Sequence, residues 1–308
     1  MQASAEVALG RGEGPGAGLV SLWALRAVAC VIGCVPFAAL AWMGAALGWL
    51  AGGILRIRRD HVERALWTAG VARPRTEAAA MYRGLGASLM ELQWLAGRRE
   101  ARPSRHAAFD ATSQALLDAA FARGRGVVLA ASHTGNWELA AAAVAGSYPL
   151  LAVTKRMSVG AVDRFVREAR AARGIDLATR DDAFPRARRA LRRGGVVAMM
   201  IDQVPDRRRH GLPVVFLGAP ALADRSPAAL AAQMRAPLVV AVTARAAGAS
   251  SMRVLAVLEP PALGVACGAR RAWVDEATRA ATAALDAFVR TSPADWLWMH
   301  RRWRIPEQ

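Results

Sequence analysis

The sequence predicts an α/β protein in which helices flank a mostly parallel β-sheet. Short apolar runs rich in β-branched residues recur along the chain, and such runs are typical of strands buried on both faces of a sheet. Helix-compatible segments separate these runs and have the length of βαβ crossovers. The 308 residues are enough for one large domain with an anchor, or for two small domains.

The N-terminal part of the chain predicts a tail followed by a membrane segment. Residues 1–26 are expected to be a flexible tail, because GRGEGPGAG has neither a preceding strand nor the GxGxxG register of a nucleotide loop. Residues 27–55 carry no charge and exceed the roughly 20 residues that cross a bilayer. We therefore expect a transmembrane or membrane-embedded helix here, and Pro36 leaves open a kinked or partly embedded one.

Arginines concentrate directly after this apolar segment. By the positive-inside rule they place residues 56–308 in the cytoplasm. The same cluster could hold anionic lipid headgroups. The arginines concerned are Arg56, Arg58, Arg59 and Arg64.

The charge composition of the chain indicates which classes of binding partner are favoured. The chain has 41 basic and 24 acidic residues, a formal net charge of +17, which favours acidic partners such as lipid phosphates, an acidic carrier protein or nucleic acid. The three cysteines form neither a disulfide framework nor a metal-ligand spacing, and we expect no metal and no cofactor. A catalytic part that faces the reducing cytoplasm is the simplest interpretation.

The rest of the chain predicts alternating elements. Residues 60–100 are expected to be helical, with an amphipathic piece at MYRGLGASLMELQWLAG. The later runs PVVF, PLVVAVTA and SMRVLAVLE are expected to extend the sheet, and a long helix is expected at about 271–291. The predicted core strands are 127–131, 149–154, 175–179 and 196–202, and the helices between them begin at 137 and span 160–173 and 182–193.

A histidine and a glutamate frame the turn after the first core strand. Asn136 is a good helix N-cap, and Glu138 then falls in the first turn, where the helix dipole favours a carboxylate. His133 lies at the carboxyl end of the strand, where open α/β sheets place their chemistry. The turn lets the carboxylate accept a hydrogen bond from one imidazole nitrogen, which leaves the other nitrogen as a base. The alternative is a loop histidine beside a helix-capping glutamate.

This segment carries a family resemblance. HTGNWE resembles the H-x4-D/E motif of the glycerolipid acyltransferase superfamily and, more closely, the His-x-Gly-Asn-Trp-Glu of the bacterial lipid A late acyltransferases, the lauroyl and myristoyl transferases. The resemblance covers nearly the whole chain and implies a glycerolipid-acyltransferase-like fold, with residues 56–308 as the acyltransferase domain. It also implies that His133 and Glu138 are the catalytic residues. The sequence departs from the family at Thr134 and at 223–226, and either change could alter the acyl or acceptor pocket.

Basic residues follow the next two predicted elements. Lys155 and Arg156 end the second core strand, where the family tends to be basic, and could hold phosphates of the substrates. An ordinary solvated pair is the alternative. Arg170 resembles the arginine of the family's R-x3-G and could bind a phosphate or stabilise an oxyanion, although Arg173 competes for this role.

Asp202 and Gln203 end the fourth core strand and resemble the family's Asp-Gln pair. Asp202 could orient an arginine or contact the acceptor, or could be only a turn aspartate. Glu91 matches a recurring glutamate, for which we favour a structural role. His210 and His300 are lone histidines that we expect at the surface or in packing.

The resemblance implies transfer of a fatty acyl group from acyl carrier protein, or from acyl-coenzyme A, to a hydroxyl of a phosphorylated glycolipid, lipid A or its precursor, at the cytoplasmic face of the inner membrane. No serine or cysteine is placed as a nucleophile, so direct transfer is expected. Other acceptors remain open: a lysophospholipid, a phosphatidylinositol mannoside-like lipid or an amino lipid.

A basic membrane module that is not an enzyme would explain the charge and the anchor, but it does not explain why the motif with His133 and Glu138 is present. Nucleic acid is disfavoured as its ligand, because a basic groove with stacking aromatics is expected for that partner. Here the tryptophans cluster in apolar segments.

Overall fold

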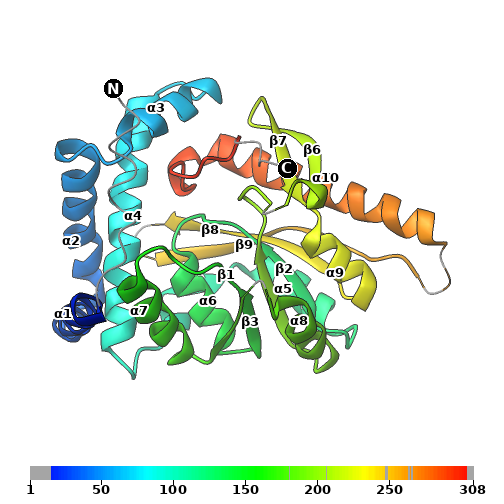
Figure 1. Ribbon diagram of the computed structural model, residues 1–308, viewed down its shortest axis with the longest axis horizontal. Helices are drawn as coiled ribbons and strands as arrows, with labels where there is room; N and C mark the ends of the chain where they lie inside the picture. The colour runs from blue at the N-terminus through cyan, green and yellow to red at the C-terminus, as the bar shows by residue number, and fades with distance from the viewer. Residues whose placement is uncertain are drawn as a thin grey trace.

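The computed structural model describes residues 15–179, 181–205, 207–246, 249–262, 264 and 266–303. Its centre is a seven-stranded sheet with the order β1-β9-β8-β2-β5-β3-β4 (Figure 1). All neighbouring strands are parallel except β8 and β9, so the predicted α/β fold with a mostly parallel sheet is confirmed. The strands are β1 (Ala107–Phe109), β2 (Val127–Ala131), β3 (Leu150–Val153), β4 (Ile175–Ala178), β5 (Val196–Met200), β8 (Leu238–Ala246) and β9 (Ala249–Leu258).

Helices cover both faces of this sheet. Val128 and Val197 pack into a core with α8, α9 and α10, whereas the adjacent residues Val127 and Val196 pack with α5 and α6 on the opposite face. This alternation follows from the two-residue period of side chains along a strand. These helices, with α7 at the edge that carries β4, are α5 (Ala111–Phe121), α6 (Trp137–Ala145), α7 (Gly160–Ala171), α8 (Ala183–Arg192), α9 (Ser226–Met234) and α10 (Cys267–Thr291).

One predicted extension of the sheet is wrong. The run PVVF lies in β6 (Gly211–Phe216), which pairs only with β7 (Ala219–Asp224) in a separate antiparallel hairpin. The hairpin closes because Leu217 and Gly218 both have positive φ, at 51° and 82°. Two consecutive residues of this kind form the turn that matches the twist of a two-stranded ribbon.

The N-terminal region is a group of helices rather than a tail and one long helix. Helix α1 (Pro15–Gly33) includes residues that the sequence assigns to the tail, and residues 1–14 lie outside the described part of the chain. The chain turns before Pro36, and α2 (Phe37–Trp49) runs in a different direction from α1 (Figure 1). Proline lacks the N–H that would continue the first helix, so the apolar segment breaks here.

Two further helices connect this region to the sheet. A π-helical turn, η1 (Leu50–Ile54), ends α2 and leads to α3 (Arg59–Thr68) and the long α4 (Pro74–Gly97). Helices α2 and α4 pack with their backbones in contact, because a Cβ at Gly44 would collide with Ala87 and a Cβ at Gly48 with Tyr82. Small residues permit this close approach. The π-helical turn leaves the backbone of Gly52 against the ring of the same Tyr82.

Candidate active site

The loop between β2 and α6 is the turn that the sequence predicts. The Asn136 side chain caps α6 by accepting a hydrogen bond from the backbone N–H of Leu139 at 2.9 Å. Gly135 has a φ of 50°, and a Cβ there would collide with the backbone of Thr243 on β8. Only glycine fits both conditions, so the loop is held tightly against the sheet.

The C-terminal segment holds the same loop from the other side. The backbone N–H of Gly135 donates to the carbonyl oxygen of Asp295 at 2.7 Å, and the backbone N–H of Leu297 donates to the carbonyl oxygen of His133 at 3.0 Å. Thr134 also forms an isolated bridge with Trp296. The main chain on both sides of the His133 ring is therefore fixed by segments far away in sequence.

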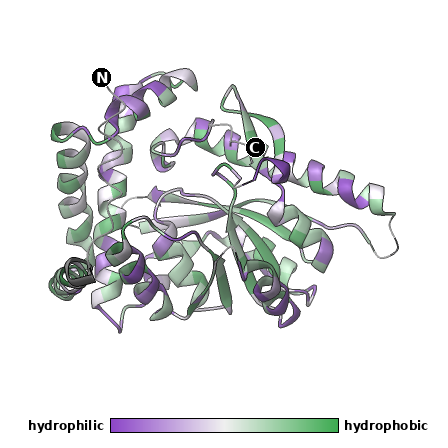
Figure 2. Ribbon diagram, viewed as in Figure 1, coloured by the Kyte–Doolittle hydropathy of each residue, from purple (hydrophilic) through white to green (hydrophobic). Residues whose placement is uncertain are grey.

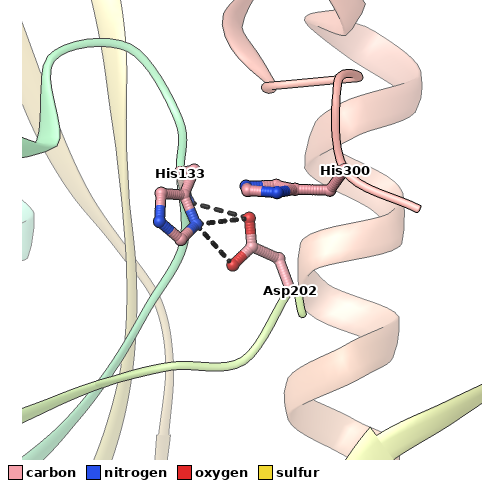
Figure 3. A group of neighbouring side chains, drawn as sticks. All are labelled: His133, Asp202 and His300. Atoms are coloured by element: carbon pink, nitrogen blue, oxygen red, sulfur yellow. Dashed lines mark hydrogen bonds and ion pairs between the residues drawn. The ribbon is translucent and has the colours of Figure 1, made fainter. Parts of the chain in front are cut away.

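The carboxylate that contacts the His133 ring belongs to Asp202. The two carboxylate oxygens lie 3.0 Å and 3.2 Å from Nδ1 of His133 (Figure 3). Oδ2 also accepts the backbone N–H of His133 at 2.9 Å and the indole N–H of Trp296 at 3.0 Å. Nδ1 is thus occupied, and Nε2 is the ring nitrogen that points away from Asp202.

The expected partnership of Glu138 with His133 is corrected by this geometry. Glu138 accepts two hydrogen bonds from Arg170, one from Nε at 2.9 Å and one from Nη2 at 2.5 Å, and a third from the indole of Trp137 at 3.1 Å. Glu138 lies in the first turn of α6 and meets α7, whereas the ring of His133 meets the end of β5. The sequence predicted Arg170 near the reacting groups but did not predict its pairing with Glu138.

The environment of Asp202 keeps its carboxylate charged. Burial alone would raise the pKa of this fully buried group, but the facing His133, its two hydrogen bonds and the nearby His300 bring the pKa well below its usual range. Asp202 therefore accepts hydrogen bonds as a carboxylate. In that state it fixes the tautomer of His133 with the proton on Nδ1 and stabilises the imidazolium form.

His300 lies beside this pair and was expected only at the surface or in packing. Its ring centroid is 4.6 Å from that of His133, and its buried Nε2 has no hydrogen-bond partner among the described residues. Burial, and then the positive charge that His133 can carry, lower the pKa of His300 to about 4. The second imidazole is therefore neutral at physiological pH.

His133, Asp202 and His300 are also potential metal ligands, because one ligand atom of each lies within 4.8 Å of the others. A metal ion on Nδ1 of His133 would displace the proton that Asp202 accepts. Metal binding at Nδ1 and the hydrogen-bonded pair are thus alternative uses of the same nitrogen. The pair satisfies the buried carboxylate without an ion.

A cavity of about 530 Å³ opens beside His133. Its walls near the carboxyl ends of the strands are polar, and six of the seven side chains that the sequence predicts for the site line it: His133, Glu138, Lys155, Arg156, Arg170 and Gln203. Asp202 lies behind His133. These six side chains therefore line one cavity, while the catalytic or binding role of each stays a prediction.

The deeper wall of the cavity is apolar. It is formed by α6 and the side of the sheet that α6 covers, through residues that include Leu129, Ala140, Ala141, Val144, Leu150 and Met252. Leu150 and Val127 both pair with Val196 of β5, so they lie at the same level of the sheet. Val127 is six residues before His133, and six residues of a β-strand span roughly 20 Å, which separates the level of Leu150 from that of His133. The cavity thus extends from the polar edge toward the amino ends of the strands.

Glu91 has the structural position that we favoured for it. Its carboxylate accepts hydrogen bonds from Arg245 of β8 at 2.8 Å and 3.1 Å, and also from the side chain of Asn136. Ser88, one turn earlier on α4, joins the same group through Arg245 at 2.9 Å and through the carbonyl oxygen of Gly135 at 3.3 Å. Helix α4 is thereby bonded to the His133 loop.

A histidine held by a buried carboxylate at the mouth of an apolar cavity is an arrangement that suits acyl transfer by general-base catalysis. The family model described as bacterial lipid A biosynthesis acyltransferase matches residues 16–305 of the chain. The chain therefore belongs to this family of acyltransferases. Comparison with curated protein sequences finds no significant match.

Proposed function

We propose that this protein transfers a fatty acyl group from an acyl-carrier-protein thioester to a hydroxyl of lipid A or its precursor, at the cytoplasmic face of the inner membrane. The observation that carries the proposal is the His133 and Asp202 pair at the mouth of the apolar cavity. The family membership supports an acyltransferase of lipid A biosynthesis. The donor, the acceptor hydroxyl and the membrane face are the proposed details.

In the proposed reaction Nε2 of His133 takes the proton of the acceptor hydroxyl. The oxygen attacks the thioester carbonyl, and the tetrahedral intermediate expels the thiolate, which takes the proton back from the imidazolium. Asp202 stabilises the imidazolium while it exists. No acyl-enzyme forms. Asp202 has the orienting role that the sequence predicted for Glu138.

The other side chains at the cavity mouth have proposed binding roles. Arg170 uses Nε and one Nη2 hydrogen for Glu138, which leaves N–H groups to donate to a phosphate or a thioester oxygen. Lys155 and Arg156 are exposed at the mouth, where they suit the phosphates of the acceptor. Gln203 also lines the mouth and can donate to a substrate carbonyl. The net charge of +17 favours an acidic carrier.

The apolar part of the cavity suits the acyl chain. Burying each methylene contributes about 0.8 kcal/mol, so a cavity that runs along the strands can bind the donor by its chain. The alanines of α6 keep this wall open, since Ala140 and Ala141 both line it. We propose that the carbonyl end of the chain lies at His133 and the methyl end near Leu150.

The test is the turnover of His133→Ala with acyl carrier protein as donor and a lipid A precursor as acceptor. Loss of the general base should lower kcat by on the order of 10²–10⁴. His210→Ala is a matched control, because His210 also lines the cavity but lies on the 208–210 turn. Near wild-type turnover of a folded His133→Ala protein would end the assignment.

The acceptor and donor have their own tests. Mass spectrometry of the lipids from a strain without the protein should show lipid A that lacks one acyl chain. A missing chain on a phospholipid or another glycolipid would redirect the proposal to that acceptor. Competition between acyl carrier protein and coenzyme A thioesters of the same chain decides the donor.

A further inference from the structure

The segment Phe37–Ile54 is long and apolar enough to cross a membrane by length and composition. The contacts at the two ends of this segment decide whether it can cross. A segment that crosses a bilayer has its ends on opposite sides of some 30 Å of hydrocarbon. If both ends are bonded to one folded domain that lies on one side, the segment cannot cross.

The first end of this segment is bonded to the sheet domain. The indole N–H of Trp94 donates to the carbonyl oxygen of Val35 at 3.2 Å. The ring of Phe37 stacks on His106 with centroids 3.7 Å apart. His106 leads directly into β1, and its carbonyl oxygen accepts the backbone N–H of Ser250 on β9 at 2.8 Å. The start of α2 therefore lies against the edge of the central sheet.

The second end is bonded near the candidate active site. The hydroxyl of Tyr82 donates to the carbonyl oxygen of Ile57. Arg58 donates to the carbonyl oxygen of Met299 at 3.0 Å, and His61 lies 3.3 Å from the carbonyl oxygen of His300. His300 is the ring that packs against His133. Both ends of the apolar segment are thus held by the domain that carries the cavity.

Helix α1 is fastened to the same domain. Arg26, which is the only charged residue between 20 and 55, forms an ion pair with Glu168 of α7 at 2.7 Å. Leu22 and Ala29 pack with Phe165 and other residues of α7 in a buried apolar cluster. An α1 on the far side of a bilayer would lose the ion pair and this cluster.

The outer faces of α1 and α2 are apolar and uncovered. Along α2 the buried stripe recurs every four residues against α4, at Leu40, Gly44 and Gly48, while Trp42 and Trp49 on the other side are 81% and 58% exposed. Figure 2 shows α2 coloured hydrophobic along most of its length. On α1 the outward residues are likewise apolar and exposed, and they include Val20, Trp23, Val28 and Val31.

We propose that α1 and α2 lie in the surface of one lipid leaflet and that the described chain enters the bilayer from one side only, without crossing it. Contiguous exposed apolar faces mark interaction surfaces, and exposed tryptophans suit the boundary between headgroups and acyl chains. Exposed Arg56, Arg58 and Arg64 follow the apolar face, where they suit anionic headgroups. This inference concerns how the protein meets the membrane and holds for any acyl acceptor.

The topology is tested with native cysteines. Cys34, before α2, and Cys267, on α10, are both exposed. Two single-cysteine full-length proteins, each with an N-terminal epitope tag, are probed in inverted membrane vesicles with an impermeant maleimide and a protease. We expect Cys267 and the tag to be reached from outside. Cys34 should be labelled from the same side, or should be shielded from both sides until detergent is added. Access to Cys34 or to the tag only from the vesicle lumen would overturn the proposal.

The surface is tested with a matched pair of substitutions. Val31 on α1 and Val215 on the β6–β7 hairpin are each 69% exposed, and the hairpin lies away from α1 and α2 (Figure 1). Val31→Asp should weaken binding to vesicles of phosphatidylethanolamine and phosphatidylglycerol by roughly tenfold, because a carboxylate is costly in the leaflet. Val215→Asp should have little effect.

Equal binding of the two variants would overturn the proposed surface. So would a result in which Val31→Asp leaves vesicle binding unchanged but dissociates a dimer in sedimentation, because a second copy would then cover this face. Vesicles of phosphatidylethanolamine and phosphatidylcholine, which carry no net charge, should bind the wild-type protein more weakly, because the arginines then have no anionic headgroups to contact.

Discussion

Two buried carboxylates flank the His133 loop, and they differ in the group that each one holds. Asp202 is fully buried and meets an imidazole, a backbone N–H and an indole N–H. Glu138 meets the guanidinium of Arg170, with both side chains 10–16% exposed. Arginine stays protonated, whereas histidine changes its charge near neutral pH. We therefore expect only the first pair to take up and release a proton during the proposed reaction.

The variant Asp202→Asn should have the largest effect and tests whether Asp202, rather than Glu138, supports His133. Asparagine keeps the shape of the side chain but cannot stabilise the imidazolium, so kcat should fall by on the order of 10²–10⁴ with little change in KM. Steady-state kinetics of the purified protein in detergent give both constants. If Asp202→Asn stays active while Glu138→Gln loses its kcat, the orienting role returns to Glu138.

The Glu138 and Arg170 pair should show its main effect in stability. Glu138→Gln leaves a largely buried guanidinium without a countercharge, which should lower the free energy of unfolding by about 3 kcal/mol. The double variant Glu138→Leu with Arg170→Met removes both charges and should recover much of this loss. Denaturant unfolding measures both. A double variant as unstable as the single one would show that lost packing, rather than unpaired charge, is the cause.

The pH dependence of stability tests the surroundings of His300, which lies beside the His133 and Asp202 pair. Its pKa is about 4 in the folded protein and near 6.5 when unfolded, so the unfolded chain binds more protons between these values. Stability should therefore fall as pH drops from 6.5 to 4, by about 2 kcal/mol after allowance for partial solvent screening. Asp202 stays ionised over this range because its pKa is lowered.

The matched variant is His300→Asn, which does not titrate. Histidines that do not contact His300, among them His106 with its lowered pKa, contribute equally to both proteins. The difference between the two stability curves, measured by denaturant unfolding at each pH, therefore isolates His300. Parallel curves would show that this ring is not held neutral by its surroundings.

The sequence predicted the local elements of the site because their signals are local. The β2 strand, its turn and α6 follow from an apolar run, Asn136 as N-cap and Gly135 as turn residue. The gathering of Lys155 and Gln203 around one cavity follows from a general rule, since the carboxyl ends of parallel strands share one edge of a sheet.

The partners within the site could not be predicted in the same way. Asp202 meets His133 because β5 is the neighbour of β2, and strand order is a property of the whole chain. Glu138 pairs with Arg170 because α7 packs in a register that no local pattern encodes. His300 has no sequence signal at all, because the C-terminal segment must first fold back onto the His133 loop.

The smallest effect is expected at an exposed charge, Arg156, in contrast to the two buried pairs. Arg156→Gln removes a cation at the cavity mouth that solvent already screens, so KM for a phosphorylated acceptor should rise about threefold to tenfold while kcat stays nearly unchanged. Arg192→Gln on α8, also exposed, is the matched control for lost surface charge. Kinetics with phosphorylated and dephosphorylated acceptors separate the two cases. If Arg156 binds the phosphate, the ratio of KM values for the two acceptors should be smaller in the variant than in the wild type.

A variant with a lower kcat and an unchanged KM ratio would contradict this role. Arg156 would then shape the site, as the buried pairs do, rather than bind the phosphate.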